Sequence, residues 1–561
     1  MNGLETLDWV VVGIYFLVIA GLAVWVIRQK TTNTEDYFLA GRNIGWFVVG
    51  ASIFASNIGS EHVVGLAGSG ASDKFPLLIY ELHAWIVLML GWVFLPFYQR
   101  AGVFTMPEFL EKRFDARARW FLSIFSLLAY VLTKVSVTVY AGGIVISTLI
   151  GEQLLSLGGV QWILEVFGLA DSANPAFWIS ALTVVVLTGI YTVMGGMRAV
   201  VYTEALQSIV LVIGAGTLTY FGLNAVGGWS AMEETVGIEY MNMWRSATDA
   251  DFPWPWLVFT STIVGIWYWC TDQYIVQRVL TAKNIQEGRR GTIWGGFLKL
   301  LPVFLFLIPG VVALALKMQG KLEWETADQA FPTLMVQILP AGLRGLVTAG
   351  LLAALMSSLA SVFNSCSTLF TVDIYKKLKP EAPERELLLT GRVATFIVVI
   401  LGIVWIPIML QISGELYEYL QSVQAYIAPP ITAVFLLGIF FKRINARGAI
   451  ATLLSGLVIA IIRITLEINK DNYTDGSFLH TLGDTNFLIF AAWYFLAMVM
   501  ICVVVSLLSP AQPEDQLTGL TRETLTPEMI AENRASYNMR DVVASVLVVL
   551  VVAYVMIAFS G

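Results

Sequence analysis

The sequence of 561 residues is poor in charged residues, cysteine and histidine. Charged residues make up 13% of the chain, about half of the roughly 25% that soluble globular domains carry. Cys270, Cys366 and Cys502 stand in apolar stretches and the histidines are scattered, so the sequence has neither a disulfide framework nor a metal-ligand spacing. A phosphate loop and a nucleophile–base pair are also missing. These absences argue against an enzyme, and nothing in the composition indicates a nucleic-acid partner.

Long apolar runs are what the sequence has in abundance. Hydrophobic residues make up 57% of the chain and the mean hydropathy is +0.75. Runs of about 20 residues cross a hydrocarbon core of about 30 Å, and the alternating segments of a barrel are not seen. We therefore predict an all-α polytopic membrane protein with fourteen transmembrane spans, at 8–27, 44–71, 75–98, 121–150, 177–196, 202–227, 256–272, 291–318, 343–374, 388–412, 414–440, 447–467, 486–508 and 541–560.

The lysines and arginines orient these spans. With residue 1 placed outside, the outside connections hold only Lys74, Arg245, Lys317, Lys321, Arg344 and Lys470. Most other cations, among them Arg28, Lys30 and Arg198, fall in inside connections. Because cytoplasmic loops carry the excess of positive charge, we predict that both termini lie outside. The polar stretch 509–540 is then a cytoplasmic surface linker.

Two spans are interrupted by polar residues. The stretch NIGSEHVVGLAGSGAS at 57–72 brings Ser60, Glu61 and His62 into an apolar segment. An unwound turn at membrane depth is tolerated where it lines a cavity, and such breaks mark binding sites of transporters. VGIWYWCTDQ at 264–273 is the candidate partner. The two segments begin five-helix blocks at 44–227 and 256–440, which predicts two structural repeats.

Four further charges lie inside predicted spans: Glu81, Lys134, Lys299 and Arg463. A charge at the bilayer centre costs about 2.5–3.5 kcal/mol, and such groups face a cavity or a partner. For Lys134 and Arg463 we favour ion pairs that hold helices together, and Arg463 is close enough to a span end to reach the interface. For Glu81 and Lys299 we favour a binding site.

Ten stretches in order resemble the sodium/solute symporter family, and within it the sodium/glucose and sodium/myo-inositol cotransporters. They are TEDYFLAGR at 34–42, NIGSEHVVGLAGSGA at 57–71, GVFTMPEFLEKRF at 102–114, PWPWLVF at 253–259, WYWCTDQYIVQRVLTAKN at 267–284, GFLKLLP at 296–302, GLRGL at 342–346, LMSSLASVFNS at 355–365, YLQSVQAYIAPP at 419–430 and AVFLLGIFFKR at 433–443. The resemblance implies a single transporter domain with a LeuT-like 5+5 inverted repeat, a leading helix at 8–27 and three trailing helices within 447–560. It also implies the plasma membrane, or the inner membrane of a bacterial source, with lipid around the helices.

The resemblance also implies the sugar site. The positions that match sugar contacts are Asn57, His62, Glu81, Tyr268, Trp269, Lys299 and Gln421. Leu66, Tyr80 and Tyr417 match the outer gate, and Tyr268 matches the inner gate. Carboxylate, amide and ammonium groups suit a polyhydroxyl ligand, although core packing would equally explain Tyr80 and Tyr417.

Sodium is the implied co-transported ion. The matching ligands are the backbone oxygens of Ala55, Ile58 and Ala354 and the hydroxyls of Ser357 and Ser358. Two-sodium members of the family carry a hydroxyl residue and an aspartate where this chain has Ala360 and Glu204. We therefore expect one sodium per substrate, with Glu204 available as a proton or sodium relay.

The expected function is sodium-coupled import of a neutral sugar such as glucose or galactose. The alternative is import of myo-inositol or another polyol, because SEH at 60–62 resembles the inositol branch. Bacterial galactose and glucose transporters of the family also carry an acid at that position, so Glu61 leaves the choice open. Import of an amino acid or carboxylate, for which Glu81 and Lys299 would be counter-charges, is the less favoured alternative.

Overall fold

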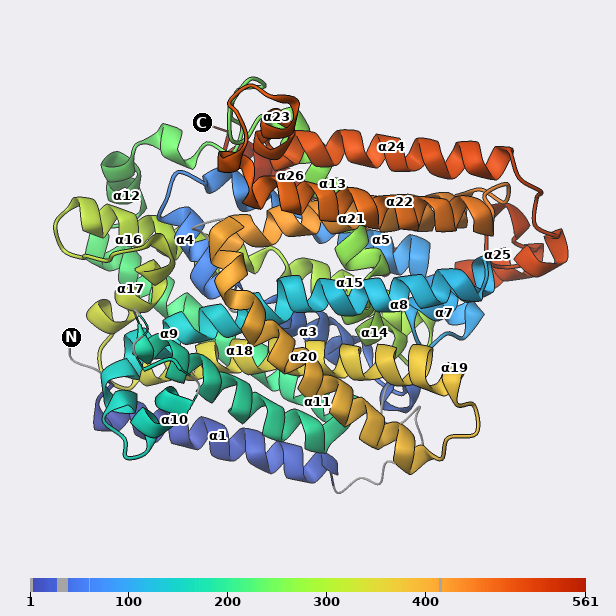
Figure 1. The fold of residues 1–561 in the computed structure, drawn as a ribbon. Helices are drawn as coiled ribbons and strands as arrows, with labels where there is room; N and C mark the ends of the chain where they lie inside the picture. Colours follow the sequence, from blue (N-terminus) through green and yellow to red (C-terminus); the bar gives the residue numbers. More distant parts are fainter. Residues whose placement is uncertain are drawn as a thin grey trace.

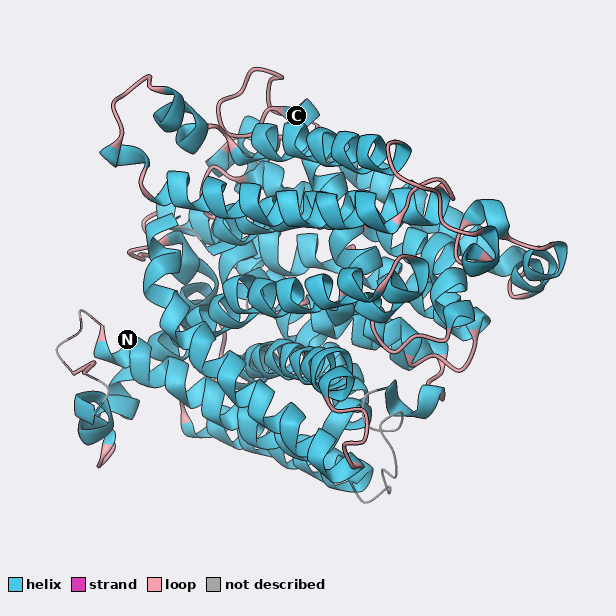
Figure 2. Cartoon of the chain, turned by 45° about the vertical axis from the view of Figure 1, so that its right-hand side comes forward, coloured by secondary structure: helices cyan, strands magenta, loops and turns pink. Residues whose placement is uncertain are grey.

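The computed structural model describes residues 4–27, 39–59, 61–166, 168–170, 172, 174–412 and 416–560, and these residues form helices joined by loops (Figure 2). Arg28, Lys30, the first part of the stretch 34–42 and Ser60 lie outside these residues. So do the side chains at 23, 26–27, 187, 189–199 (Arg198 among them), 405 and 407–412. Strand-like pairing in the described residues is an isolated parallel bridge between Ile44 and Ala282.

The helices of the first half include one broken span. Helix α3 and the segment Glu61–Gly70 meet at 59° across a short break and together are long and apolar enough for one span. The elements, with π- and 3-10-helical turns labelled η, are α1 (Thr6–Ile27), α3 (Trp46–Asn57), η2 (Glu61–Leu66), α4 (Ala67–Gly70), η3 (Phe75–Tyr80), α5 (Ala84–Met89), η4 (Leu90–Phe94), α6 (Leu95–Ala101), α7 (Met106–Arg113), α8 (Ala116–Tyr130), η5 (Val131–Val135), α9 (Ser136–Leu155), α10 (Val160–Val166), α11 (Pro175–Val226) and α12 (Trp229–Val236).

The second half contains the second interruption. A π turn, η7, ends helix α13, and Asp272 then has extended backbone and caps α14 through the N–H of Tyr274. The elements are α13 (Trp254–Ile266), η7 (Trp267–Thr271), α14 (Gln273–Leu280), α15 (Ile285–Leu298), η8 (Val303–Leu307), α16 (Ile308–Met318), α17 (Ala330–Ile338), α18 (Leu343–Thr368), η10 (Leu369–Tyr375), α19 (Lys376–Leu378), α20 (Glu384–Ile412), α21 (Leu416–Phe440), α22 (Ala446–Ile468), α23 (Phe478–Asp484), α24 (Phe487–Leu507), α25 (Pro527–Ala535) and α26 (Met539–Ala558).

The described residues contain ten helices long and apolar enough to cross a membrane, or eleven with the bent span. This confirms the prediction of an all-helical, multi-pass membrane protein. Two predicted spans, 177–196 and 202–227, fall within the single helix α11. Its parts from Pro175–Val186 and Val200–Val226 are separately apolar.

The helices differ in how far they are buried. In the apolar part of Leu343–Leu378, which contains α18, 89% of the residues are buried, and the share is 83% in α21 but 22% in α26. Large apolar side chains point outward from the little-buried helices, for example Trp493 and Met500 on α24 and Leu550 and Tyr554 on α26. Helices α18 and α21 therefore form the interior, and α24 and α26 carry exposed apolar surface.

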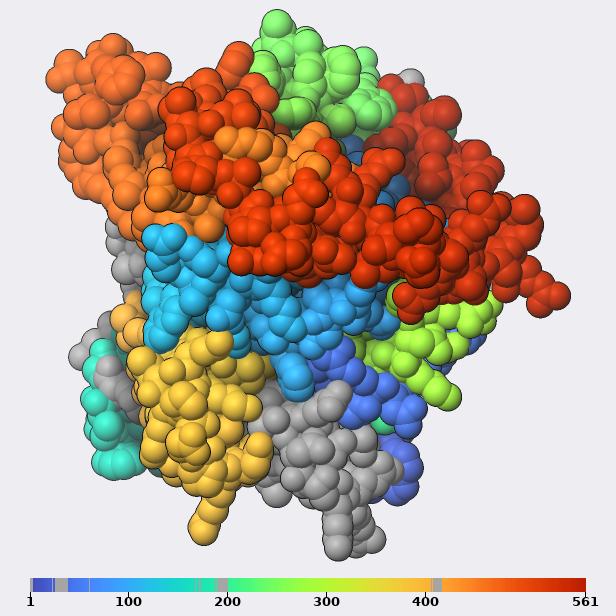
Figure 3. Space-filling view, turned by 90° about the vertical axis from the view of Figure 1, so that its right-hand side faces the viewer, coloured from blue at the N-terminus to red at the C-terminus, as the bar shows by residue number. Residues whose placement is uncertain are grey.

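Both chain ends lie at the same end of the helix bundle (Figure 1). Helices α12, α17 and α23 share that end, and α7, α19 and α25 lie at the opposite end. Figure 3 looks onto the opposite end, where the C-terminal segment covers part of the surface.

The polar stretch 509–540 is anchored to that surface. It holds η12 (Glu514–Leu517), η13 (Arg522–Thr524) and α25. Arg113 Nη1 donates to Gln512 Oε1 at 2.9 Å and Arg289 Nη2 donates to Asn533 Oδ1 at 2.7 Å. The predicted surface linker is thus a partly helical strap tied to the ends of several helices.

Candidate binding site

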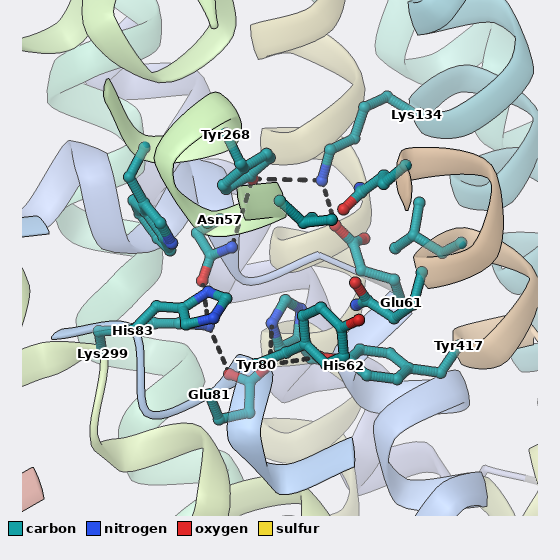
Figure 4. A pocket seen from close by; sticks show the side chains of 16 residues that line it. Asn57, Glu61, His62, Tyr80, Glu81, His83, Lys134, Tyr268, Lys299 and Tyr417 are labelled. Atoms are coloured by element: carbon teal, nitrogen blue, oxygen red, sulfur yellow. Dashed lines mark hydrogen bonds and ion pairs between the residues drawn. The ribbon is translucent and has the colours of Figure 1, made fainter. Parts of the chain in front are cut away.

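A small closed cavity lies where both interrupted segments meet. Its volume is about 30 Å³, which is far below the roughly 300–1,000 Å³ of typical small-molecule sites. The lining side chains are almost completely buried. They are Asn57, Glu61, His62, Tyr80, Glu81, His83, Lys134, Val264, Gly265, Tyr268, Trp269, Lys299, Tyr417, Leu420, Gln421 and Gln424 (Figure 4).

Irregular helix turns present most of the charged and aromatic side chains. Glu61 and His62 lie on the π turn η2, Lys134 lies on η5, and Tyr268 and Trp269 lie on η7. A π turn inserts an extra residue into a helix and is common at functional sites. It also changes which side chains face inward, so these residues reach the cavity without following a regular helical face.

One ion pair closes the end of the cavity near Glu81. Lys299 Nζ donates to Glu81 Oε2 at 2.6 Å and to Asn57 Oδ1 at 3.0 Å. The other carboxylate oxygen, Oε1, accepts a hydrogen bond from the Tyr417 hydroxyl at 2.6 Å and lies 3.3 Å from His62 Nε2. A hydroxyl-rich ligand could replace the three partners of this ion pair, Asn57, His62 and Tyr417, one by one.

A second ion pair lies across the cavity. Lys134 Nζ donates to Glu61 Oε1 at 2.8 Å and to the Tyr268 hydroxyl at 3.2 Å. The amide of Asn57 also donates to that hydroxyl, at 3.3 Å. The two carboxylates are thus matched by two ammonium groups, an arrangement that suits a neutral substrate.

Aromatic rings supply the apolar part of the wall. Tyr268 and Trp269 meet edge to face with ring centroids 5.0 Å apart. Lys299 Nζ lies 5.4 Å from the Trp269 ring and Lys134 Nζ lies 4.7 Å from the Tyr268 ring. Flat aromatic faces next to hydrogen-bonding groups suit a ring that has both C–H and O–H surfaces.

The residues expected at the sodium site lie beside the break of α3. Ser357 Oγ on α18 donates to the Ala55 carbonyl at 3.2 Å. Ile58 follows α3 with extended backbone. Ser358 Oγ is buried without a hydrogen-bond partner among the described residues, and Ala354 is buried one turn earlier on the same helix. The structure therefore brings the C-terminal end of α3 next to Ser357 and Ser358 on α18.

A group of buried polar contacts around Glu204, called here the Glu204–Arg278 lock, joins α3, α11, α14 and α18. Glu204 accepts hydrogen bonds from the hydroxyls of Ser52, Ser56 and Ser361 and pairs with Arg278 at 3.3 Å. All of these side chains are buried. The hydroxyl of Tyr274 bonds to the Ser56 carbonyl, and that of Tyr130 bonds to Asp272.

Nine of the residues expected from the sequence line the cavity together: Asn57, His62, Tyr80, Glu81, Tyr268, Trp269, Lys299, Tyr417 and Gln421. Leu66 is buried but does not line it. Sequence reasoning did not assign Glu61, His83 or Gln424 to the pocket, and it favoured a helix-holding role for Lys134. The charge of Glu61 and Lys134 inside spans was the signal that could have found them.

Arg463 lies elsewhere. Its guanidinium donates to the carbonyls of Gly483 and Thr485 at 2.8 and 2.9 Å and pairs with Glu467 at 3.6 Å. The hydrogen bonds to these carbonyls join α22 to the α23–α24 connection. The ion pair with Glu467 lies within α22, so it does not hold two helices together as the sequence interpretation expected.

Comparison with known proteins identifies the family of the chain. The family model described as Sodium:solute symporter family matches residues 37–173 and 157–456. The rabbit (Oryctolagus cuniculus) sodium/glucose cotransporter 1 is 39% identical over 558 residues, which cover 91% of this chain and 80% of that protein. The dog (Canis lupus familiaris) sodium/myo-inositol cotransporter is 36% identical over 593 residues, with 96% and 79% covered.

Solved structures share the fold. A Na⁺-coupled sialic acid symporter in a substrate-bound outward-open state superposes with a TM-score of 0.71 at 23% identity and covers 91% of this chain and 99% of that chain. A nucleobase-cation-symport-1 family transporter in a closed conformation gives a TM-score of 0.50 at 15% identity, with 88% and 100% covered.

Proposed function

Because the chain belongs to the sodium:solute symporter family and is a transporter rather than an enzyme, we propose that it imports a neutral sugar or cyclic polyol together with sodium. The observation that carries this proposal is the buried cavity with balanced charges, in which Glu81 and Lys299 hold each other between Asn57, Tyr417 and Trp269. Relatives named sodium/glucose and sodium/myo-inositol cotransporters support it.

In this proposal the substrate binds to Asn57, His62, Glu81, Tyr268, Trp269, Lys299 and Gln421. Glu81 accepts hydrogen bonds from two hydroxyls, and Lys299 donates to a third. Gln421 Oε1, which has no partner among the described residues, accepts another. The ring of the substrate stacks on Trp269 or Tyr268.

The cavity has to widen before a substrate can enter. Its present volume is about 30 Å³, which is about the volume of one water molecule in the liquid. We propose that Leu66, Tyr80 and Tyr417 close it toward the outside and Tyr268 toward the inside. The Glu204–Arg278 lock then has to open on the inner side, while Tyr417 holds Glu81 on the outer side. Alternation between these two barriers is what moves the substrate.

The membrane topology is part of the proposal. We propose fourteen spans, with repeats at 44–227 and 256–440, a leading helix at 8–27 and trailing helices within 447–560. Both chain ends lie on one side of the bundle, as an even number of spans requires. The concentration of lysine and arginine in the connections at the other end assigns that end to the cytoplasm.

A direct uptake measurement tests the function. In proteoliposomes, we expect an inward sodium gradient to drive accumulation of labelled glucose, galactose or myo-inositol, and a choline gradient to drive none. Comparison of the three substrates decides between the sugar and polyol alternatives. If sodium accelerates uptake of an amino acid and of none of these compounds, the proposal is wrong.

We also propose a single sodium site formed by the oxygens of Ala55, Ile58, Ala354, Ser357 and Ser358, and hence one sodium per substrate. Glu204 already bonds to three serine hydroxyls and to Arg278, and Ala360 has no side-chain oxygen to complete a second site. With one ion, a tenfold larger sodium gradient shifts the substrate ratio at zero net flux about tenfold; with two ions the shift is about a hundredfold. Measurement of the zero-flux ratio in vesicles at set gradients separates the two, and a hundredfold shift would refute the single site.

A further inference from the structure

The carboxylate of Glu61 has one oxygen that the ion pair with Lys134 does not use. Oε1 accepts the hydrogen bond from Lys134 at 2.8 Å. Oε2 is buried and has no hydrogen-bond partner among the described residues, in a side chain that is 1% exposed. A buried charged oxygen without a partner is costly, so this oxygen points to a ligand.

The hydroxyl of Ser358 is a second buried oxygen without a hydrogen-bond partner among the described residues. The whole residue is fully buried. Most buried serine hydroxyls in a membrane helix bond to the carbonyl one turn earlier, as Ser365 does with Ser361 on the same helix. Ser358 does not make that bond.

The two unpartnered oxygens converge on the break between α3 and η2. A Cβ placed on Gly59 would lie closer than 3.0 Å to both Glu61 Oε2 and Ser358 Oγ. Both oxygens therefore lie on the same side of the Gly59 backbone. Ile58 precedes Gly59 in the chain. Ser357, the neighbour of Ser358, donates a hydrogen bond to the Ala55 carbonyl, so the expected sodium ligands lie next to these two oxygens.

We propose that Glu61 Oε2 and Ser358 Oγ together bind the co-transported sodium, so that the cation site contains a carboxylate. This inference rests on the proposed function and adds a ligand to its neutral oxygen set. Hard cations take carboxylate, carbonyl and hydroxyl oxygens, and a carboxylate supplies the negative charge that the set at Ala55, Ile58, Ala354, Ser357 and Ser358 lacks.

This assignment gives Lys134 a role in coupling. Lys134 bonds to Glu61 on one side and to the Tyr268 hydroxyl at 3.2 Å on the other. Asn57 continues the hydrogen-bond chain from Tyr268 to Lys299 and Glu81. A cation bound to Glu61 competes with Lys134 for the carboxylate and weakens the hydrogen bond between Lys134 and Glu61. The Lys134 ammonium group can then donate to Tyr268 or to the substrate. Affinities for the two ligands then rise together, as linkage requires.

Binding of ²²Na⁺ to the purified protein tests the assignment without transport. The glutamine amide offers the cation no negative charge, so Glu61→Gln should raise the sodium concentration for half-saturation about tenfold or more, which corresponds to about 1.4 kcal/mol or more. Ser358→Ala should raise it in the same direction. Glu467→Gln removes a carboxylate from another intramembrane ion pair, with Arg463, and should leave sodium binding unchanged.

The double variant Glu61→Gln/Lys134→Met distinguishes a ligand from a structural ion pair. It removes both charges, so no buried charge is left unpaired and folding is preserved. If Glu61 binds sodium, the double variant keeps the raised sodium requirement. Recovery of wild-type affinity in the double variant, or an affinity of Glu61→Gln within twofold of wild type, would overturn the inference. Absence of saturable ²²Na⁺ binding by the wild-type protein would instead overturn the proposed function itself.

Discussion

Replacement of Glu81 by glutamine is expected to lower the apparent affinity for the transported sugar about 10- to 100-fold. The amide keeps the size of the side chain but loses the charge that accepts from Lys299 at 2.6 Å and from Tyr417 at 2.6 Å. Hydrogen bonds to a charged group contribute about 1.5–3 kcal/mol, which corresponds to this range of affinity. The variant also leaves Lys299 buried without its counter-charge, and that adds to the loss.

The measurement is sodium-driven uptake as a function of sugar concentration in proteoliposomes. Glu418→Gln is the matched control, because it removes a carboxylate that pairs with Lys74 at 2.5 Å near the surface, where ion pairs contribute little. Its apparent affinity should stay within twofold of wild type. The double variant Glu81→Gln/Lys299→Gln then measures how far the two residues act as a unit. If Glu81→Gln alone behaves like the control, the cavity is not the sugar site.

Gly59→Ala is expected to abolish sodium-driven uptake while the protein still folds. The added Cβ would lie closer than 3.0 Å to Glu61 Oε2 and Ser358 Oγ, and the Glu61 carboxylate is the group able to move away. Movement of the carboxylate breaks its hydrogen bond to Lys134, and the added methyl group fills the space between the two oxygens. Overpacking of this kind costs about 1–3 kcal/mol, which a membrane protein of this size tolerates, but the proposed cation site is lost.

Gly13→Ala in α1 is the control for the same chemical change, since a Cβ at Gly13 meets nothing within 4 Å. Expression and a monodisperse elution profile show that each variant folds, and uptake at several sodium concentrations reports the site. If Gly59→Ala retains uptake within twofold of wild type at every sodium concentration, the space beside Gly59 has no part in cation binding.

The class of protein and the places where its helices break could be predicted from the sequence. Membrane insertion depends on the length and apolarity of each run, and both are local properties of the sequence. The breaks at 57–62 and 267–272 follow from small and polar residues in apolar segments, which is local as well. Asn57 and Trp269 could be nominated because they lie in recognisable motifs, and Glu81 because it is a charge inside a predicted apolar span.

The partners of these residues were decided by the tertiary structure. Lys299 pairs with Glu81, 218 positions away, and Lys134 pairs with Glu61, 73 positions away. Which charges meet depends on how each helix is rotated and where helices cross, and the π turns η2, η5 and η7 shift that rotation without any clear mark in the hydrophobic pattern.

The sequence by itself thus determined that this chain is a helical membrane protein of a symporter family, with polar residues at two helix breaks, because insertion and helix breaking respond to neighbouring residues. Only the tertiary structure decided that Glu61 and Lys134 share the cavity with Glu81 and Lys299 and that Leu66 lies outside it. It alone brought Ser358 and Glu61 together beside Gly59. The physical reason is that burying four charges requires opposite charges from distant helices to meet at bonding distance, and that condition is satisfied only in the packed bundle.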